Sequence, residues 1–433
     1  MTPEVRDRIE QLRHGNVPEG YKRTKAGILP ADWAVCSIDE CLERVERPVN
    51  VQADEMYTQI GIRSHGKGLF YKDPVTGKSL GNKAVYWIEP DCFVLNIVFA
   101  WEQAIGKTTT SEVGMIGSHR FPMYRPVDGK IDIDYLISYL MTKRGKDILE
   151  AASPGGAGRN RTLGQDRFMK SKIVLPALDE QKKIAEILTT QDKVIELKEK
   201  LLAEKQRQKK YLMQQLLTGK KRLPGFDDEW AIVSFENVFT FLPTNTLSRD
   251  CMSETEGTVF NIHYGDILVR YLEVLDATSI ELPRIKPGAE PNNITNIRDG
   301  DLIIADTAED LSVGKAVEIQ NAKDKCIASG LHTIFCRPNK GMFAAGWLGY
   351  YINSPVFHNQ LIPLICGVKV SSISKKEIVK TTIAVPSIRE QGAIVNRLSV
   401  ASREIDLLSQ DIEQERQKKK ALMQLLLTGI VRV

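Results

Sequence analysis

The sequence predicts an α+β fold in which two globular domains of mixed α/β structure alternate with two long helices, as a pseudo-two-fold internal repeat. One observation behind this prediction is that residues 209–223 and 419–433 are identical at ten of their fifteen positions. A second is that each of these stretches closes a long segment almost free of Gly and Pro, as a long helix requires. A third is that the segments ahead of the two helices also correspond.

The bulk composition is that of an ordinary globular chain. Its 433 residues suffice for two to four domains, and a hydrophobic content of 42% with a charged content of 26% is typical of such proteins. The N-terminus is charged and contains no apolar signal core, so we expect a cytoplasmic protein without a membrane span. The seven cysteines form no CxxC pair, which predicts free thiols in a reducing compartment.

Each long segment begins with the same motif, P–x–x–x–E–Q, at Pro176 and again at Pro386. Apolar residues then recur at 3–4 spacing, the pattern of a coiled-coil seam, and about 38 residues make a helix of about 57 Å. We expect the two helices to pair with each other, since two solvated linker helices would leave the matched seams without a purpose. The predicted seam, or subunit-interface, residues are Ile184, Leu188, Ile195, Leu202, Leu212, Leu216, Ile394, Leu398, Ile405, Leu408, Ile412, Leu422 and Leu426.

The segments ahead of the long helices match as well. Residues 29–38 resemble 223–235, where Leu-Pro is followed by Trp and a strand-like run, and residues 90–109 parallel 300–319. Both domains combine short β-branched strands with Gly-rich turns and one or two helices. The predicted organisation is an N-terminal helical segment at 1–20, a first domain at 21–178, a first long helix at 179–219, a second domain at 220–388 and a second long helix at 389–433.

No enzyme motif in the sequence is complete. The stretches VTGKS and GKTT end like phosphate-binding loops, but Lys72 and Trp101 stand where the first glycine is required. No HExxH motif and no paired Cys/His spacing indicates zinc. We therefore expect no catalytic residues, no metal site and no cofactor bound by this chain.

Basic residues gather instead in glycine-rich segments. Residues 153–170 form a Gly-rich loop with Arg159 and Arg161, and segment 141–172 holds eight Lys/Arg against three Asp/Glu. The matching loop of the second half carries Lys369. Glycine allows close approach of the backbone to another surface, and arginine binds phosphates or guanine edges, so these loops are candidates for nucleic-acid contact. The alternative is that they are solvated basic loops.

A second candidate is GIRSHGKGLFYK at 61–72, where basic residues interleave with Gly and aromatic residues as in nucleic-acid contacts. The two domains differ in charge. Residues 44–130 contain eleven basic and nine acidic side chains, whereas residues 240–330 contain eight basic and fifteen acidic side chains. This acidic excess weakens a DNA-binding interpretation of the second domain, although carboxylates can accept hydrogen bonds from cytosine amino groups.

Over nearly the whole chain, these motifs resemble those of the specificity (S) subunit of Type I restriction–modification systems. The P–x–x–x–E–Q helices ending in LMQ–x–LLTG are similar to that family's two conserved spacer regions. GIRSHGKG, NIVFAWEQA, GMIGSHRFPMY and SPGGAGRN–x–TLGQ resemble one class of its target-recognition domains. DGDLIIADTAED–x–x–VGKA together with SGLHT resembles another class.

The resemblance implies a non-catalytic subunit that reads a bipartite double-stranded DNA target and directs methyltransferase (modification) and restriction (helicase–nuclease) subunits to it. S-adenosylmethionine, ATP and Mg would then be bound by those partners. The long helices would pair antiparallel and set the gap between the half-sites, and the segment 1–20 would lie near the end of the second helix. The implied DNA-binding residues are Arg63, His65, Lys67, Lys107, Ser118, His119, Arg120, Arg159, Asn160, Arg161, Tyr264, Asp306, Thr307, Lys315, His332 and Lys369.

Two other classes of function stay open at this point. One is a single-chain enzyme that both reads and modifies DNA, and the incomplete motifs argue against it. The other is a coiled-coil scaffold protein that does not bind DNA. Genes for a methyltransferase and a helicase–nuclease beside the gene of this chain would favour the specificity subunit over the scaffold.

Overall fold

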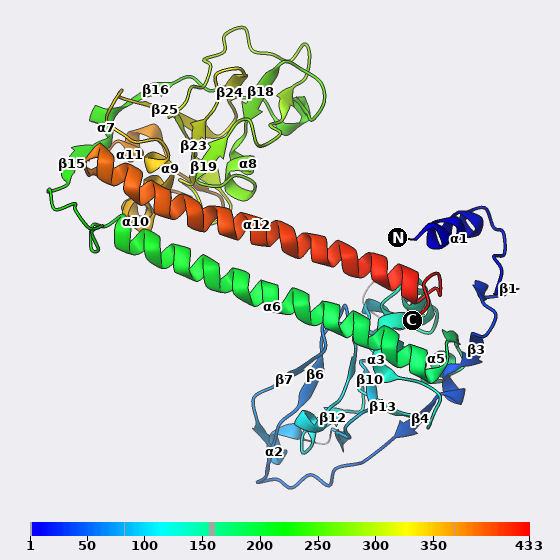
Figure 1. Cartoon of the computed structure of the whole chain (residues 1–433). Helices are drawn as coiled ribbons and strands as arrows, with labels where there is room; N and C mark the ends of the chain where they lie inside the picture. The colour runs from blue at the N-terminus through cyan, green and yellow to red at the C-terminus, as the bar shows by residue number, and fades with distance from the viewer. Residues whose placement is uncertain (1, 82, 156–160, 368) are drawn as a thin grey trace. The chain divides into compact units, whose positions relative to one another are not determined.

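The computed structural model describes residues 2–81, 83–155, 161–367 and 369–433 (Figure 1). The chain divides into two compact units. Unit 1 comprises Met1–Lys198 and Asp411–Val433, and unit 2 comprises Glu199–Gln410. Each unit therefore holds one of the two predicted domains together with part of each long helix.

Unit 1 is built on a four-stranded antiparallel sheet in the order β11–β10–β13–β4. Five antiparallel strand pairs complete its β-structure: β1–β2, β3–β14, β5–β8, β6–β7 and β9–β12. The strands are β1 Tyr21–Thr24, β2 Gly27–Pro30, β3 Ala34–Ser37, β4 Leu42–Val45, β5 Met56–Tyr57, β6 Ile60–Ile62, β7 Leu69–Tyr71, β8 Val75–Thr76, β9 Val85–Trp87, β10 Phe93–Leu95, β11 Ile105–Lys107, β12 Ile116–Ser118, β13 Met123–Pro126 and β14 Lys172–Leu175. The helices are α1 Pro3–Arg13, α2 Gly77–Leu80, α3 Ile133–Leu140, α4 Lys143–Ala151 and α5 Gln165–Met169, with 3₁₀ turns η1 Ile38–Glu40, η2 Ala100–Glu102 and η3 Thr110–Glu112.

Unit 2 contains a five-stranded sheet in the order β16–β25–β21–β23–β19 and a four-stranded sheet in the order β17–β20–β18–β24. Both sheets are mixed, because β19 runs parallel to β23 and β18 runs parallel to β24. The strands are β15 Ala231–Ser234, β16 Phe239–Leu242, β17 Met252–Ser253, β18 Val259–Ile262, β19 Val274–Asp276, β20 Arg284–Ile285, β21 Leu302–Ala305, β22 Thr307–Ala308, β23 Ala316–Gln320, β24 Cys326–Ser329, β25 Thr333–Pro338, β26 Ser371–Ser372 and β27 Thr382–Val385. The helices are α7 Phe235–Val238, α8 Tyr264–Val269, α9 Trp347–Ile352, α10 Pro355–Leu361 and α11 Lys375–Ile378, with 3₁₀ turns η4 Arg249–Cys251 and η5 Ile362–Leu364.

The two long helices are α6, Leu178–Leu216, and α12, Ile388–Leu426, each of 39 residues. Within unit 1 the first part of α6 lies antiparallel to the last part of α12, where Nζ of Lys198 lies 2.8 Å from Oε1 of Glu415. Within unit 2 the remaining parts of the same helices also pair, and Lys205 contacts Glu404 at 2.8 Å. In the part of the chain that the structure describes, no helix is both long enough and apolar enough to cross a membrane.

The predicted seam residues lie on the inner faces of the helices in each unit. The end of the seam nearest each domain is also part of that domain's hydrophobic core: Ile184 and Leu188 pack in unit 1, and Ile394 and Leu398 pack in unit 2. Within each unit, these seam residues therefore belong to the same apolar cluster as the core of the domain. The buried members are Ile184, Leu188, Leu216, Ile394, Leu398, Ile412 and Leu426, and the half-buried members are Ile195, Leu202, Leu212, Ile405, Leu408 and Leu422.

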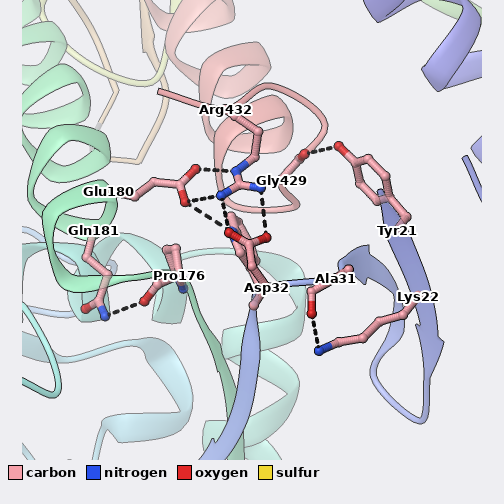
Figure 2. Close-up of polar contacts among 10 residues, drawn as sticks. Tyr21, Lys22, Ala31, Asp32, Pro176, Glu180, Gln181, Gly429 and Arg432 are labelled. Atoms are coloured by element: carbon pink, nitrogen blue, oxygen red, sulfur yellow. Dashed lines mark hydrogen bonds and ion pairs between the residues drawn. The ribbon is translucent and has the colours of Figure 1, made fainter. Parts of the chain in front are cut away.

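The glutamate of each P–x–x–x–E–Q motif anchors a cluster of three side chains, which we call the clasp. In unit 1 Glu180 accepts hydrogen bonds from Arg432 at 2.6 and 2.8 Å and from the indole of Trp33 at 3.2 Å, and Figure 2 shows Arg432 reaching Asp32 as well. Arg432 belongs to the C-terminal segment and Trp33 to the start of the first domain, so the unit 1 clasp joins these two segments to the start of α6.

Unit 2 repeats the clasp: Glu390 stands 210 positions after Glu180, Arg222 stands 210 positions before Arg432, and Trp230 takes the place of Trp33. Glu390 accepts from Arg222 at 2.7 and 2.8 Å and from the indole of Trp230 at 3.0 Å. Bidentate bonds between arginine and carboxylate are both strong and geometrically specific. The repeated motif thus fixes the start of each long helix to the segment that enters the adjoining domain.

The glutamine of the motif binds the domain itself. Nε2 of Gln181 donates to the carbonyl oxygens of Pro176 and Lys130, and Nε2 of Gln391 donates to those of Pro386 and Met342. The amide oxygens of Gln181 and Gln391 accept from backbone N–H groups of the same domain loops, at 2.9 and 2.8 Å. Both glutamines are buried, so each side chain replaces the water that these backbone groups would otherwise bind.

The N-terminal segment lies against the C-terminal segment within unit 1. Arg8, on α1, donates to the carbonyl oxygen of Ile430, and the hydroxyl of Tyr21 donates to that of Gly429, both at 2.5 Å (Figure 2 shows the second bond). The guanidinium of Arg8 also lies over the ring of Tyr21. The structure thus places α1 near the end of the second long helix, as the resemblance implied.

Candidate nucleic-acid interface

Three segments of unit 1 that the sequence singled out meet at one loop, residues 96–103, between β10 and β11. Ile97 in this loop donates its backbone N–H to the carbonyl oxygen of Arg120 at 3.0 Å. The carbonyl oxygen of Ile97 accepts from the N–H of Leu163, within the Gly-rich segment 153–170, at 2.8 Å. The segments around 120 and around 161 are therefore held side by side, and we call this arrangement the three-loop junction.

The β6–β7 hairpin attaches to the same loop. Backbone N–H groups of His65 and Gly66 donate to the carbonyl oxygens of Glu102 and Gln103 at 2.8 and 2.9 Å. The hydroxyl of Ser64 adds a bond to the Glu102 carboxylate at 2.9 Å. Gly66 has a φ of +63°, a conformation that favours glycine, and this lets the hairpin tip turn onto the loop.

The cationic side chains of this region are positioned by aromatic rings. The guanidinium of Arg63 lies 5.0 Å from the ring centre of Phe70, and that of Arg161 lies 5.4 Å from that of Trp101. Arg63 remains exposed and Arg161 half-exposed, so both can still reach a ligand. Contacts of this kind orient a guanidinium without neutralising its charge.

The other predicted residues of unit 1 are placed as follows. His65, Lys67, His119 and Arg120 are exposed at the junction, and Ser118 is half-buried at the end of β12. Arg159 and Asn160 lie outside the described residues.

Lys107 differs from these residues because it forms a 2.7 Å ion pair with Asp134. Burial alone would lower the pKa of Lys107, but the bond to Asp134 and the negative charges of Asp134, Asp132 and Asp91 together outweigh burial and raise this pKa. Its ammonium is therefore already engaged within the domain and is a weaker candidate for DNA contact than the exposed cations.

Unit 2 contains the same junction with different side chains. Asp306, directly after β21, donates its backbone N–H to the carbonyl oxygen of His332 at 3.1 Å, and its carbonyl oxygen accepts from Ile373 at 2.8 Å. These are the bonds that Ile97 makes with Arg120 and Leu163 in unit 1. Because backbone groups form the junction in both units, its geometry is retained while its side chains differ.

Five predicted residues of unit 2 gather at this second junction. The ring of Tyr264, on α8, meets that of His332 edge-on with 5.2 Å between centres. Nδ1 of His332 lies 3.4 Å from Asp306 and 3.3 Å from the hydroxyl of Thr307. The exposed Lys369 lies two residues before β26, which pairs with β22 at Thr307. His332 is exposed and has a φ of +53°, so its ring is displayed at the tip of its loop.

Lys315 does not join this group. Its ammonium donates to the carbonyl oxygen of Leu268 at 2.8 Å, and burial lowers its pKa. His263 is a neighbour of the junction that the sequence interpretation missed. Its Nδ1 accepts from the N–H of Gly265 at 3.2 Å and so caps α8, the helix that carries Tyr264. A His directly before a short helical run was the only sequence signal for it.

The loop 96–103 is the other part of the site that sequence reasoning did not assign. Trp101 was noted as the residue that breaks a phosphate-loop pattern, and both Trp101 and Glu102 were noted as part of the NIVFAWEQA motif, yet they position Arg161 and the hairpin. Across the described residues, no group of three or more His, Cys, Asp or Glu side chains could hold a metal ion. The groups that the two junctions offer to a ligand are hydrogen-bonding side chains, charges and aromatic rings.

Comparison with known proteins agrees with this architecture. The family described as "Type I restriction modification DNA specificity domain" matches residues 79–206. The chain is 25% identical to a putative Type I restriction enzyme MjaX specificity subunit of Methanocaldococcus jannaschii, covering 96% of this chain and 97% of that protein. It is 23% identical to the Type I restriction enzyme MjaVIII specificity subunit of the same organism, over 96% of both chains.

A solved structure has the same fold. The S subunit of a Type I restriction–modification system from M. genitalium is similar to this chain with a TM-score of 0.56, at 12% identity, over 91% of this chain and 96% of that one. The fold is thus that of a chain with a duplicated mixed α/β domain and two long helices, as in that S subunit. More narrowly, this chain is similar over nearly its whole length to specificity subunits of Type I restriction enzymes, and the family model matches within it at residues 79–206.

Proposed function

We propose that the chain reads a bipartite double-stranded DNA target, one half-site at each three-loop junction, and directs methyltransferase and restriction subunits to it. The observation that carries this proposal is the duplicated junction itself. In both units the same backbone bonds hold three loops together, while the exposed side chains differ. A retained frame with different side chains is what two recognition domains for two different half-sites require.

The side chains at each junction suit DNA in different ways. In unit 1, Arg63, Arg120 and Arg161 can bind phosphates or the O6 and N7 acceptors of guanine. In unit 2, Asp306 can accept from a cytosine amino group, and His332 adds a ring that can donate or accept. The excess of acidic residues in unit 2 supports a division of labour in which phosphate contacts come mostly from unit 1 and from partners.

The alternative of a scaffold that does not bind DNA is not favoured. Pairing the long helices requires the seam and the clasps, and neither of them includes Arg63, Arg161, Tyr264 or His332. The cofactors S-adenosylmethionine, ATP and Mg are assigned to the partner subunits.

The proposal is tested by measuring binding of the chain, assembled with its methyltransferase subunit, to DNA carrying the motif that methylome sequencing of the host defines. We expect Arg161→Ala and His332→Ala each to weaken specific binding, since one good base contact contributes about 1–3 kcal/mol. The control is Arg13→Ala, an exposed arginine on α1 outside both junctions. Binding unchanged by both junction variants would contradict the proposal.

A further inference from the structure

Two cysteines of unit 1, Cys36 on β3 and Cys41 directly after η1, lie with their sulfur atoms 3.3 Å apart. This distance is a hydrogen-bonding contact between thiols, and both cysteines are free. The bond of a disulfide measures about 2.05 Å, so the two sulfur atoms would have to approach each other by about 1.2 Å to form one. Neither cysteine takes part in the three-loop junction or in the clasp.

A short turn holds the two cysteines together. Ser37 and Glu40 form a reciprocal capping box around η1, in which the backbone N–H of Ser37 donates to the Glu40 carboxylate at 3.1 Å. The N–H of Cys41 donates to the carbonyl oxygen of Ile38 at 2.9 Å, which closes the turn. The backbone therefore imposes the contact between the sulfur atoms, and a disulfide would close a ring within the stretch 36–41.

The surroundings of the two sulfur atoms differ. Cys36 is half-exposed, whereas Cys41 is only 1% exposed. The hydrogen bond from Cys41 is the largest of the effects that hold the pKa of Cys36 below its usual value. Burial and Glu40 oppose this effect, and the charges of Lys172 and Lys130 act in the same direction as the bond. The same bond, together with burial, raises the pKa of Cys41. Cys36 is thus the sulfur that forms a thiolate and meets solvent, and Cys41 keeps its proton.

The internal repeat shows the same frame without the thiols. In unit 2, β15 corresponds to β3, and Val233 and Val238 occupy the positions of Cys36 and Cys41. Val233 lies on a strand that pairs with the strand ahead of α12, just as Cys36 lies on a strand that pairs with the strand ahead of α6. Val233 is half-buried and Val238 is 1% exposed, like the two cysteines. Because the frame forms with two valines, packing alone does not require two thiols at these positions.

We propose that Cys36 and Cys41 are a peroxide-reactive pair, in which Cys36 is oxidised first and Cys41 then closes a reversible disulfide with it. An accessible thiolate reacts with peroxides, and a second thiol beside it converts the first product into a disulfide before further oxidation. The geometry of unit 1 supplies both requirements within one turn. This chemistry is independent of the proposed function.

The reaction is a two-electron oxidation by hydrogen peroxide or an organic hydroperoxide. The Cys36 thiolate attacks the terminal oxygen of the peroxide and the O–O bond breaks, which leaves Cys36 as a sulfenic acid. Hydroxide or alkoxide departs and takes a proton from the solvent. The Cys41 sulfur then attacks the Cys36 sulfur, the S–O bond breaks, and the oxygen leaves as water with the thiol proton of Cys41. One disulfide forms for each peroxide reduced, and a small dithiol reverses it by exchange.

The test treats the reduced full-length chain with hydrogen peroxide, alkylates the remaining thiols before digestion and maps them by mass spectrometry. Trypsin releases residues 26–44 as one peptide that contains Cys36, Cys41 and no other cysteine. We expect this peptide two hydrogen atoms lighter than its reduced form and without alkyl groups, and we expect dithiothreitol to restore both alkylation sites. The exposed Cys326 and Cys366 are internal controls, and their thiols should be consumed at least about fivefold more slowly.

Matched variants that carry the valines of unit 2 separate the two roles. In Cys41→Val, Cys36 has no partner, so peroxide should leave it as a sulfenic acid that dimedone labels. In Cys36→Val, the buried Cys41 should stay reduced and unlabelled, because a buried thiol with a raised pKa reacts poorly. Thermal unfolding shows whether each variant folds, and mapping of the wild-type chain decides on the disulfide without any variant.

Two results would overturn the proposal. If peptide 26–44 of the wild-type chain kept both thiols reduced while Cys326 and Cys366 were oxidised, the pair would not be a site of reaction with peroxide. If dimedone labelled Cys41 in Cys36→Val as strongly as it labelled Cys36 in Cys41→Val, the order of oxidation would be wrong. Neither result would bear on DNA recognition, which a binding assay measures separately.

Discussion

Replacing Arg432, the arginine of the unit 1 clasp, should destabilise unit 1 locally, around the clasp. In the variant Arg432→Ala, Glu180 loses both of its bonds to the guanidinium, and the indole of Trp33 becomes its remaining clasp partner. The Glu180 side chain is only 7% exposed, so its carboxylate is left mostly buried and less well paired. The bond to Asp32 is lost as well, but Asp32 is 61% exposed and water replaces that contact at little cost.

The size of the effect follows from burial. Removing one partner of a fully buried ion pair costs about 3–5 kcal/mol. Because the Arg432 side chain is 38% exposed, water recovers part of this, and we expect about 2 kcal/mol. In the matching variant of unit 2, Arg222→Ala, the arginine is 26% exposed and Glu390 only 1% exposed, so we expect the larger cost of about 3 kcal/mol.

Hydrogen exchange measured by mass spectrometry separates the two units. Arg432→Ala should raise exchange of the amides of β3 and of the first turns of α6 by about 30-fold, the factor for 2 kcal/mol, and leave β15 and the first turns of α12 unchanged. Arg222→Ala should raise exchange in β15 and in the first turns of α12 and leave β3 and the first turns of α6 unchanged. If Arg432→Ala changed exchange in neither unit, or equally in both units, the clasp would not be what holds the C-terminal segment to the rest of unit 1.

Two further predictions concern the junctions. Burial, with the charges of Arg249 and His332, lowers the pKa of His263 and outweighs the opposing effect of Asp266. As the pH falls, the unfolded chain therefore takes up a proton at this residue before the folded chain does, so the stability of unit 2 should fall as the pH drops below about 6.5. The variant His263→Asn keeps a cap on α8 and should flatten this pH dependence, as measured by urea unfolding at several pH values. The variant Gly66→Ala places a Cβ 2.5 Å from Sδ of Met141, whereas the Cβ of Gly68→Ala meets nothing within 4 Å at a similar φ. Thermal unfolding should therefore show the larger loss of stability for Gly66→Ala. Equal losses of stability would contradict the close packing of the hairpin tip.

The parts of the fold that could be predicted from the sequence are those with local or repeated signals. The seam residues were assigned because 3–4 spacing of apolar side chains defines a helix face wherever it occurs. The starts of the long helices were assigned because the motif repeats at a fixed offset. The clasps explain why that motif is retained, but Trp33 and Arg432 stand about 400 residues apart, and no local pattern connects them.

The junctions could be predicted only as separate segments. The segments around Arg63, Arg120 and Arg161 were each selected for their basic side chains, whereas backbone bonds to residues 96–103 bring them together. Backbone hydrogen bonds do not depend on the type of side chain, so the sequence did not identify loop 96–103 as the place where these segments meet. Lys107 and Lys315 were predicted to be DNA-binding cations for a related reason. Their partners, Asp134 and the carbonyl oxygen of Leu268, are brought next to them only by the fold.

The central claim is that each unit reads one half of a bipartite DNA target. The most direct test replaces residues 21–175, up to Pro176, with the matching domain of another specificity subunit and sequences the methylome of cells that carry the chimera. The account predicts that one half of the methylated motif changes while the other half is retained, because the unit 2 junction and both long helices are untouched. A chimera that methylates a motif changed in both halves, or a motif unchanged in both halves, would contradict it.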